Sequence, residues 1–292
     1  MDTAAAQNRY RSIKLILLLV LALNWTVALA KIVFGLLSRC SSMTADGFHS
    51  LSDGASNIIG LIGIHFACQP VDKDHPYGHK KYETFFSLGI AMMLFLVSFN
   101  LIEEAIRRMH NPVVPRIDII SFVVMLVTTA VNLWVMRFER KKGETLQSDI
   151  LLSDAMHTKA DIFTSLSVII TLVVIKLGFP LLDPIATILI SLFIARAGYQ
   201  IVKQSSSVLC DAAVILDVKK ITDIVLGVKG VKTCHKVRTR GRPDDIYVDL
   251  HVQMNSNMHI DDAHKISYAI EGALKKGIPE ITDVVVHIEP RE

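Results

Sequence analysis

The sequence predicts an α-helical membrane protein, in which a six-transmembrane-helix bundle is followed by a small α/β domain with the order α-β-β-α-β. The first observation is composition: 51% of the 292 residues are hydrophobic, which is high for a soluble protein and low for one made only of membrane spans. The second is a series of six long apolar segments. The third is a change of pattern near residue 211, after which short helical and alternating stretches follow.

Six apolar segments are each close to the length of about 20 residues that a helix needs to cross a bilayer. They cover approximately residues 15–37, 43–68, 85–102, 117–138, 148–177 and 185–202. The first segment also imitates a signal peptide, because basic residues precede it and Ala28–Ala30 resembles a cleavage site. The apolar run resumes after Lys31 and further spans follow, so we expect a membrane span here.

Six spans place both chain termini on one side of the membrane, and Lys and Arg residues indicate which side. With the N-terminus in the cytoplasm, the inner segments carry ten basic residues and the outer turns five, which is the bias that cytoplasmic loops show. We therefore expect a cytoplasmic segment over residues 1–14, a transmembrane domain over 15–208 and a cytoplasmic domain over 209–292. The expected location is a bacterial inner membrane, with an organellar membrane as the alternative.

The C-terminal region is expected to form a sheet that is covered by helices on one face. The predicted elements are a helix over 216–226, strands over 231–240 and 246–254, a helix over 261–276 and a strand over 283–289. From Ile246 to Met254, apolar and polar residues alternate, which is the pattern of a half-buried strand.

Two of the apolar segments contain the same polar pattern, Asp-x-x-His-x-x-x-Asp. The residues that match it are Asp46, His49, Asp53, Asp154, His157 and Asp161. Positions i, i+3 and i+4 of a helix share one face, so each copy is expected to form a polar stripe. A charged side chain at the centre of a membrane helix costs at least about 2.5 to 3.5 kcal/mol, which makes these residues functional candidates.

Two facing stripes would offer two imidazole nitrogens and two carboxylate oxygens to one divalent cation. The predicted ligands are His49, Asp53, His157 and Asp161. Asp46 and Asp154 could each accept a ring N–H from the following histidine and fix its tautomer. Asn57 extends the first stripe by one turn. The alternative is a water-filled polar cavity, or pairing with basic residues, without a metal.

A second cluster lies in the predicted inner loop between the second and third spans. Asp72, His75 and His79 fall within eight residues, together with a second aspartate. Pro76 and Gly78 preclude a regular helix, so this loop could wrap around an ion. A solvated loop with incidental histidines is the alternative.

A third cluster is predicted in the C-terminal region. His235, His251 and His287 each fall on an expected strand, and His264 falls on the expected helix. Glu289 shares a strand face with His287, because side chains alternate with a period of two. These residues are available to a ligand or a partner subunit, and exposed surface histidines are the alternative.

Several other functions fit the sequence less well. The net charge of +3, with scattered basic residues, argues against nucleic acid as a partner. Four cysteines without a C-x-x-C pair indicate neither a disulfide framework nor a zinc knuckle. An intramembrane metallohydrolase would need an open coordination position and a general base, and the sequence has no H-E-x-x-H motif. A metal-sensing dimeric membrane scaffold is the alternative from a different class.

Over essentially its full length, the chain resembles the cation diffusion facilitators of the zinc-type metal/proton antiporter branch. The motifs that carry the likeness are HSLSD and HTKAD in two spans and QPVDKDHPYGHKKYE in the loop. The resemblance implies a metallochaperone-like cytoplasmic domain, a transport site at the four stripe ligands, a loop metal site and a cytoplasmic metal site. The last of these is implied at His235, His251 and His287, with His264. The resemblance also implies a homodimer in the lipid bilayer, with Lys81 and Asp211 in an inter-subunit charge cluster.

The function implied is that of a secondary active transporter, not an enzyme. It would move a divalent cation, above all Zn²⁺, out of the cytoplasm in exchange for protons by alternating access. Zn²⁺ would be both the substrate and a regulatory ligand, and Fe²⁺, Co²⁺ and Cd²⁺ are the alternatives. His49 stands where some bacterial members carry Asp, which adds a nitrogen ligand and disfavours manganese. Glu289 also stands where some members carry Asp, which leaves its role as a ligand open.

Overall fold

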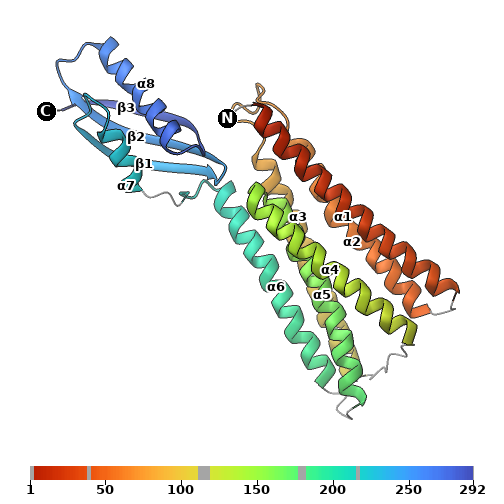
Figure 1. The fold of residues 1–292 in the computed structure, drawn as a ribbon. Helices are drawn as coiled ribbons and strands as arrows, with labels where there is room; N and C mark the ends of the chain where they lie inside the picture. The colour runs from red at the N-terminus through yellow and green to blue at the C-terminus, as the bar shows by residue number, and fades with distance from the viewer. Residues whose placement is uncertain (1–2, 38–40, 111–118, 177–181, 215–217, 292) are drawn as a thin grey trace. The chain divides into compact units, whose positions relative to one another are not determined.

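The computed structural model describes residues 3–37, 41–110, 119–176, 182–214 and 218–291, and Figure 1 shows their arrangement. The chain divides into two compact units, one of residues Ala6–Ser205 and one of Ser206–Glu292 together with Met1–Ala5. Each unit is described by itself below.

Six long helices, one for each predicted span, form the bundle. They are α1 (Thr3–Leu37), α2 (Ser41–Ala67), α3 (Lys81–His110), α4 (Ile119–Leu146), α5 (Asp149–Lys176) and α6 (Leu182–Leu209). Helices α1, α3, α4 and α6 extend several residues beyond the predicted spans, because the residues at their ends continue the helix outside the apolar part. Among the described residues, Gln7–Ala30 and Lys81–Arg107 are long and apolar enough to cross a membrane, and Gly54–Ala67 is a shorter apolar stretch.

Apolar packing joins the helices in two clusters. One cluster is formed mainly by α1, α2, α3 and α5 and includes Leu17, Ile64, Ile90 and Ile150, all at most 2% exposed. The other joins α3, α5 and α6. Close helix approach in membranes needs small residues, and Gly60 of α2 meets this need: a Cβ there would stand 2.8 Å from Cγ2 of Ile150.

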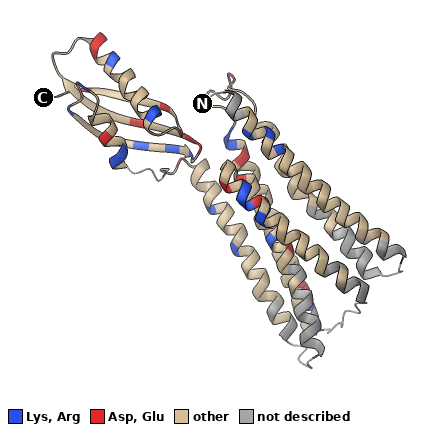
Figure 2. Cartoon of the chain, in the orientation of Figure 1, with Lys and Arg blue, Asp and Glu red and all other residues tan. Residues whose placement is uncertain are grey.

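Many charged residues of the bundle lie at one end, although Glu103, Glu104 and Arg107 lie toward the other end of α3. Figure 2 shows them around the start of α3, the end of α4 and the start of α5. The polar stripe of the fifth predicted span begins at this same end of α5.

The C-terminal unit has the predicted order α-β-β-α-β. Its elements are α7 (Val218–Leu226), β1 (Thr233–Arg242), β2 (Asp245–Asn255), α8 (Ile260–Gly277) and β3 (Ile281–Arg291). The sheet order is β1-β2-β3, in which β2 pairs antiparallel with β1 and parallel with β3. Alternate residues of β2, including Val248, Leu250 and Val252, are at most 1% exposed and pack in one core with residues of α7 and α8.

The turn between β1 and β2 is shorter than the predicted GRPDD turn, because both strands extend into it. Gly241 has φ +115° and lies against the backbone of Asp245, a conformation that strongly favours glycine. The antiparallel pairing therefore continues to Arg242 and Asp245 at the hairpin end.

Candidate metal centres

Helices α2 and α5 run antiparallel, and specific contacts set their register. Gly60 lies against Ile150, and one turn away Nδ2 of Asn57 donates a hydrogen bond to Oδ2 of Asp154. Both side chains of this hydrogen bond are 1% exposed. Asn57 belongs to the first polar stripe and Asp154 to the second, so the two stripes face each other at this point.

A polar cavity of ≈ 20 Å³ lies further along the same two helices. Its walls come from α1, α2, α4 and α5: Asn24, Val27, Ser50, Thr128, Asn132, Thr158 and Asp161. A space of this size holds about one water-sized species. Ser50 and Asp161 line it in the register that the Asn57–Asp154 contact sets. The cavity is thus a polar chamber that includes a predicted ligand.

The same register gives the backbone positions of the predicted transport-site residues. If the register of the Asn57–Asp154 contact continues along both helices, residue 53 is expected near the level of residue 158 and residue 49 near the level of Asp161. His157 is 2% exposed on α5. The backbones of Asp46, His49 and Asp53 lie within α2, and their side chains lie outside the described residues.

A chain of buried polar contacts connects four helices beside this chamber. Nδ2 of Asn24 in α1 donates to Oδ1 of Asn57 at 3.2 Å, and Asn57 donates to Asp154. Asp154 also interacts with Glu139 of α4 and lies within electrostatic range of His157. Oγ1 of Thr158 donates to Oε2 of Glu139 at 3.1 Å. The chain fixes α1, α4 and α5 around the first stripe.

Glu139 was not among the residues predicted from the sequence, although it is fully buried. It lies in the charged run from Arg137 to Lys142, which is indistinguishable from a solvated helix end in sequence alone. In α4, residue 139 faces α5 and is buried, whereas its neighbour Arg140 points outward and is exposed. Only the structure shows this difference in burial. Asn24 gave a weaker signal as an isolated polar residue in an apolar span.

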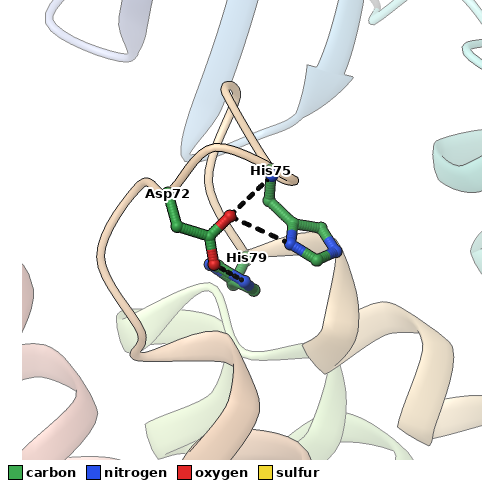
Figure 3. A group of neighbouring side chains, drawn as sticks. All are labelled: Asp72, His75 and His79. Carbon is green, nitrogen blue, oxygen red and sulfur yellow. Dashed lines mark hydrogen bonds and ion pairs between the residues drawn. The ribbon is translucent and has the colours of Figure 1, made fainter.

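The predicted loop residues Asp72, His75 and His79 do come together, as Figure 3 shows. One ligand atom from each of them lies within 4.8 Å of the others. Oδ1 of Asp72 accepts the backbone N–H of His75 at 2.6 Å, and Oδ2 stands 3.3 Å from Nε2 of His79. The backbone hydrogen bond from His75 lowers the pKa of Asp72 below its usual value, so this carboxylate is ionised at neutral pH.

The local chain geometry explains why the loop forms this cluster. Gly78 has φ +83°, which turns the chain between the two histidines. His79 is 4% exposed, and its Nδ1 atom has no hydrogen-bond partner among the described residues. The hydroxyl of Tyr82 lies 3.3 Å from Nε2 of His75. A buried ring nitrogen without a partner is costly, and a bound cation could satisfy this histidine.

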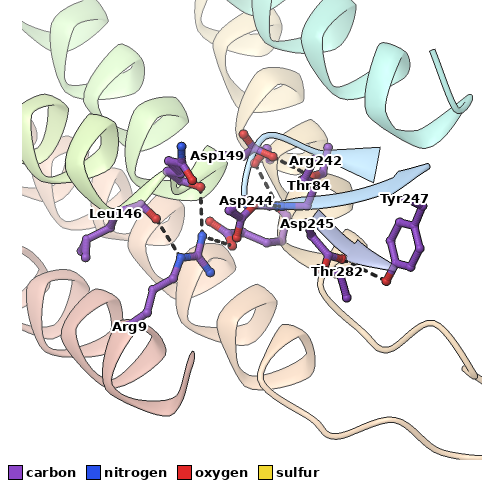
Figure 4. A network of polar contacts seen from close by, with 12 residues as sticks. Arg9, Thr84, Leu146, Asp149, Arg242, Asp244, Asp245, Tyr247 and Thr282 are labelled. Carbon is purple, nitrogen blue, oxygen red and sulfur yellow. Dashed lines mark hydrogen bonds and ion pairs between the residues drawn. The ribbon is translucent and has the colours of Figure 1, made fainter. Parts of the chain in front are cut away.

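The end of the bundle next to the loop is held by a polar network, drawn in Figure 4. Arg9 of α1 donates to the carbonyl of Leu146 at 2.7 Å and pairs with Glu83 at 3.2 Å. Oγ1 of Thr84 donates to Oδ2 of Asp149 at 2.6 Å. These contacts fix the start of α3, to which the loop leads, against α1, α4 and α5.

The strand residues form a second cluster with Glu289 at its centre. The two carboxylate oxygens of Glu289 lie 3.1 Å from Nε2 of His235 and 2.8 Å from Nδ1 of His251. Ligand atoms of these three residues lie within 4.8 Å of one another. His287 is adjacent, with its ring centroid 4.5 Å from that of His251, and its side chain is 62% exposed.

The sheet register accounts for this arrangement. His251 on β2 pairs directly with His235 on β1 and with His287 on β3. The hydrogen bond to His251 lowers the pKa of Glu289 below its usual value. His264 is not brought into this cluster: it is exposed on α8, with its ring 4.7 Å from that of Tyr268. Helix α8 packs on the opposite face of the sheet from His251.

Lys81 and Asp211 belong to different units and are described separately. Lys81 is the first residue of α3. Asp211 follows α6, has φ +54° and lies 3.8 Å from the guanidinium of Arg240.

Comparison with known proteins agrees with these features. The model of the cation efflux transmembrane domain matches residues 17–210, and that of the cytoplasmic domain of cation efflux proteins matches 216–291. An uncharacterized transporter of Methanocaldococcus jannaschii is 30% identical over 283 residues, which cover 96% of this chain and 99% of the relative. The manganese efflux system protein MneS of Bacillus subtilis is 27% identical, with 90% of each chain covered. The cation-efflux pump FieF of Shewanella oneidensis is 26% identical, with 91% of this chain and 90% of the relative covered.

The two family models together account for nearly the whole chain, and the transmembrane model alone covers more than half of it. The helical bundle and the α-β-β-α-β domain match the expectation from the sequence. The chain therefore belongs to the cation diffusion facilitator family of cation-efflux membrane transporters.

Proposed function

We propose that this protein exports Zn²⁺ from the cytoplasm in exchange for protons by alternating access. The observation that supports this most strongly is the antiparallel register of α2 and α5. The contact between Asn57 and Asp154 supports this register, and Asp161 lines a polar cavity further along the same helices. A cavity of this kind inside a membrane bundle costs free energy, so we attribute to it a function in transport.

In this proposal His49 and Asp53 from α2, with His157 and Asp161 from α5, bind the transported ion. Two imidazole nitrogens and two carboxylate oxygens form a tetrahedral set that suits Zn²⁺, with bond lengths of about 2.0 to 2.2 Å. Manganese prefers oxygen ligands, so two nitrogens favour zinc over manganese. The name of the relative MneS makes Mn²⁺ the competing substrate to be tested, beside Fe²⁺, Co²⁺ and Cd²⁺.

Proton exchange would follow from the chemistry of the ligands. Metal binding requires neutral imidazole and ionised carboxylate, so an arriving cation displaces protons. Histidine has an unperturbed pKa of about 6.5, which puts this exchange near neutral pH. Protons that return from the other side of the membrane would then release the ion and reset the site.

The other two clusters are proposed as accessory metal sites. Asp72, His75 and His79 would bind an ion in the loop, and the exposed carboxylate of Asp72 leaves that site open to solvent. His235, His251 and Glu289, with His287 beside them, would form a regulatory site in the C-terminal domain. A cation there would replace hydrogen bonds that Glu289 already makes with two histidines.

The assembly and location are proposed on the same basis. We propose a homodimer in a bacterial inner membrane, with both termini in the cytoplasm and with Lys81 and Asp211 in the charge cluster between subunits. The support is the bias of Lys and Arg residues toward the segments that would then face the cytoplasm. Cysteine accessibility at Lys14→Cys in sealed vesicles would test the orientation.

The test of the transport proposal uses full-length protein in liposomes with an imposed pH gradient. Zn²⁺ uptake should disappear in Asp53→Asn and Asp161→Asn, and it should persist in Asp262→Asn, which removes an exposed carboxylate of α8. Normal uptake by either of the first two variants would refute the transport site.

A non-transporting metal-sensing scaffold predicts a different result. It would show no uptake in the unaltered protein and would lose metal-dependent dimerisation in His251→Ala. Metal-dependent proton release from the purified protein, compared between Zn²⁺, Mn²⁺, Fe²⁺, Co²⁺ and Cd²⁺, would identify the substrate.

A further inference from the structure

A groove runs between α4, α5 and α6, outside the candidate metal sites. It consists of two cavities of ≈ 610 Å³ and ≈ 320 Å³. The two cavities share Met156, Lys159 and Gln200 in their walls, so they adjoin. Their combined size is that of a site for a small organic molecule, about 300 to 1,000 Å³.

The charges in this groove are not balanced. Arg140 pairs with Glu144 at 2.9 Å, and Asp149 accepts a hydrogen bond from Thr84. Lys159 and Arg196 are exposed in the second cavity, and neither has an acidic partner within the described part of the chain. The walls of the second cavity therefore carry two positive charges and no negative one.

The position of these two charges along the helices calls for a ligand. Lys159 is ten residues beyond the first residue of α5, which places it about 15 Å along the helix axis. An ionised side chain within a membrane-spanning helix is costly unless an opposite charge or water compensates it. A path for a divalent cation would not present two uncompensated positive charges, since these repel the ion.

The other walls of the second cavity are apolar. Phe163 and Phe193 both line it, and Phe193 is 65% exposed. Nζ of Lys159 lies 5.6 Å from the ring centroid of Phe163. The second cavity thus combines two cationic side chains, which suit an anionic headgroup, with an aromatic surface, which suits the attached acyl chains. Basic pockets between membrane helices bind the headgroups of anionic lipids.

We propose that this groove binds an anionic phospholipid, whose phosphate lies between Lys159 and Arg196 and whose acyl chain follows Phe163 and Phe193. The inference depends on the membrane location of the bundle and not on the identity of the transported metal. A lipid held there would link α5, which carries two proposed transport ligands, to α6.

The test is native mass spectrometry of the full-length protein titrated with dioleoyl-phosphatidylglycerol or dioleoyl-phosphatidylcholine. The variant Lys159→Gln with Arg196→Gln should bind phosphatidylglycerol about 25-fold more weakly, from about five-fold for each basic residue. The control Arg11→Gln with Lys14→Gln removes two exposed charges of α1 and should change binding less than about three-fold.

Further measurements distinguish this proposal from a general charge effect or a folding defect. Lys159→Arg with Arg196→Lys keeps both charges and should retain binding, whereas phosphatidylcholine binding should be equal in all variants. An unchanged preference for phosphatidylglycerol in the double Gln variant would overturn the proposal. Weaker dimerisation of that variant without loss of lipid binding would also overturn it, because the groove would then be covered by a partner subunit.

Discussion

The hydrogen bond between Asn57 and Asp154 is the contact on which the register of α2 and α5 depends most directly. We predict that a double-mutant cycle of Asn57→Ala and Asp154→Ala will show favourable coupling between these residues. Asn57 also accepts a hydrogen bond from Asn24 at 3.2 Å. The loss of that second bond occurs in both arms of the cycle and therefore cancels.

The size of the coupling follows from the environment of the two groups. Hydrogen bonds between membrane helices contribute on average about 0.6 kcal/mol and at most about 1.7 kcal/mol. Asn57 and Asp154 are both 1% exposed, and the acceptor is a carboxyl oxygen, so the value should lie near the upper limit. Asp154 keeps contacts to Ser56 and Glu139 in the Asn57→Ala variant, which limits the loss. We expect about 1.5 kcal/mol.

The assay is reversible unfolding of the full-length protein in mixed micelles with increasing dodecyl sulfate, followed by circular dichroism. Ser98→Ala provides the control pair with Asn57→Ala. Its hydroxyl is buried and donates to the carbonyl of Ser191 at 2.9 Å, so it shares no partner with Asn57. Coupling in the control pair should stay within about 0.5 kcal/mol.

A coupling between Asn57 and Asp154 no larger than that of the control would refute the reasoning. The two side chains would then not touch, and the register from which residue 53 is expected near the level of residue 158 would be wrong. The transport proposal would lose its main structural support, whatever the transport assays show.

Three further predictions concern packing, pH and the loop site. Gly60→Ala should lower the melting temperature of the protein, because its Cβ would overlap Ile150 of the facing helix at a cost of about 1 to 3 kcal/mol. The control Gly272→Ala has nothing within 4 Å of the added Cβ and should stabilise α8 by about 1 kcal/mol. Equal shifts of the melting temperature in the two variants would contradict the close packing at Gly60. The hydrogen bond with His251 is the main reason that the pKa of Glu289 in the folded protein lies below 4.5. The contribution of ionised Glu289 to the stability of the domain is therefore complete above pH 4.5, and it is lost as the pH falls through the lowered pKa of the folded protein. Glu289→Gln should therefore make urea unfolding of the C-terminal domain less dependent on pH below 4.5, and identical pH profiles would disprove this interaction. Asp72→Asn should weaken Zn²⁺ binding by the loop at least about tenfold in calorimetry, in a protein without the ligands of the transport site and of the C-terminal site; unchanged binding would show that this carboxylate is not a ligand.

The helices, the strands and the family were predictable from the sequence, because each depends on local order. Apolar segments of membrane length give the six helices, and the alternation from Ile246 to Met254 gives β2. The motif HTKAD identifies the family by residue type and spacing alone. The short separation from Asp72 to His79 likewise makes their contact a local property of the loop.

Contacts between distant segments required the tertiary structure. The sequence left the role of Glu289 open, and the parallel pairing of β2 with β3 brings it to two histidines. It predicted His264 beside them, but α8 covers the other face of the sheet. Only the phase of α4 separates buried Glu139 from exposed Arg140.

The amino-acid sequence by itself determined which residue types stand on which face of each helix or strand, because the periods of 3.6 and 2 are properties of the backbone. The tertiary structure decided how those faces meet. The antiparallel register of α2 and α5 depends on the close approach at Gly60 and on one buried hydrogen bond at Asn57. The sequence alone does not show either interaction, because the residues that make contact are almost a hundred positions apart in the chain.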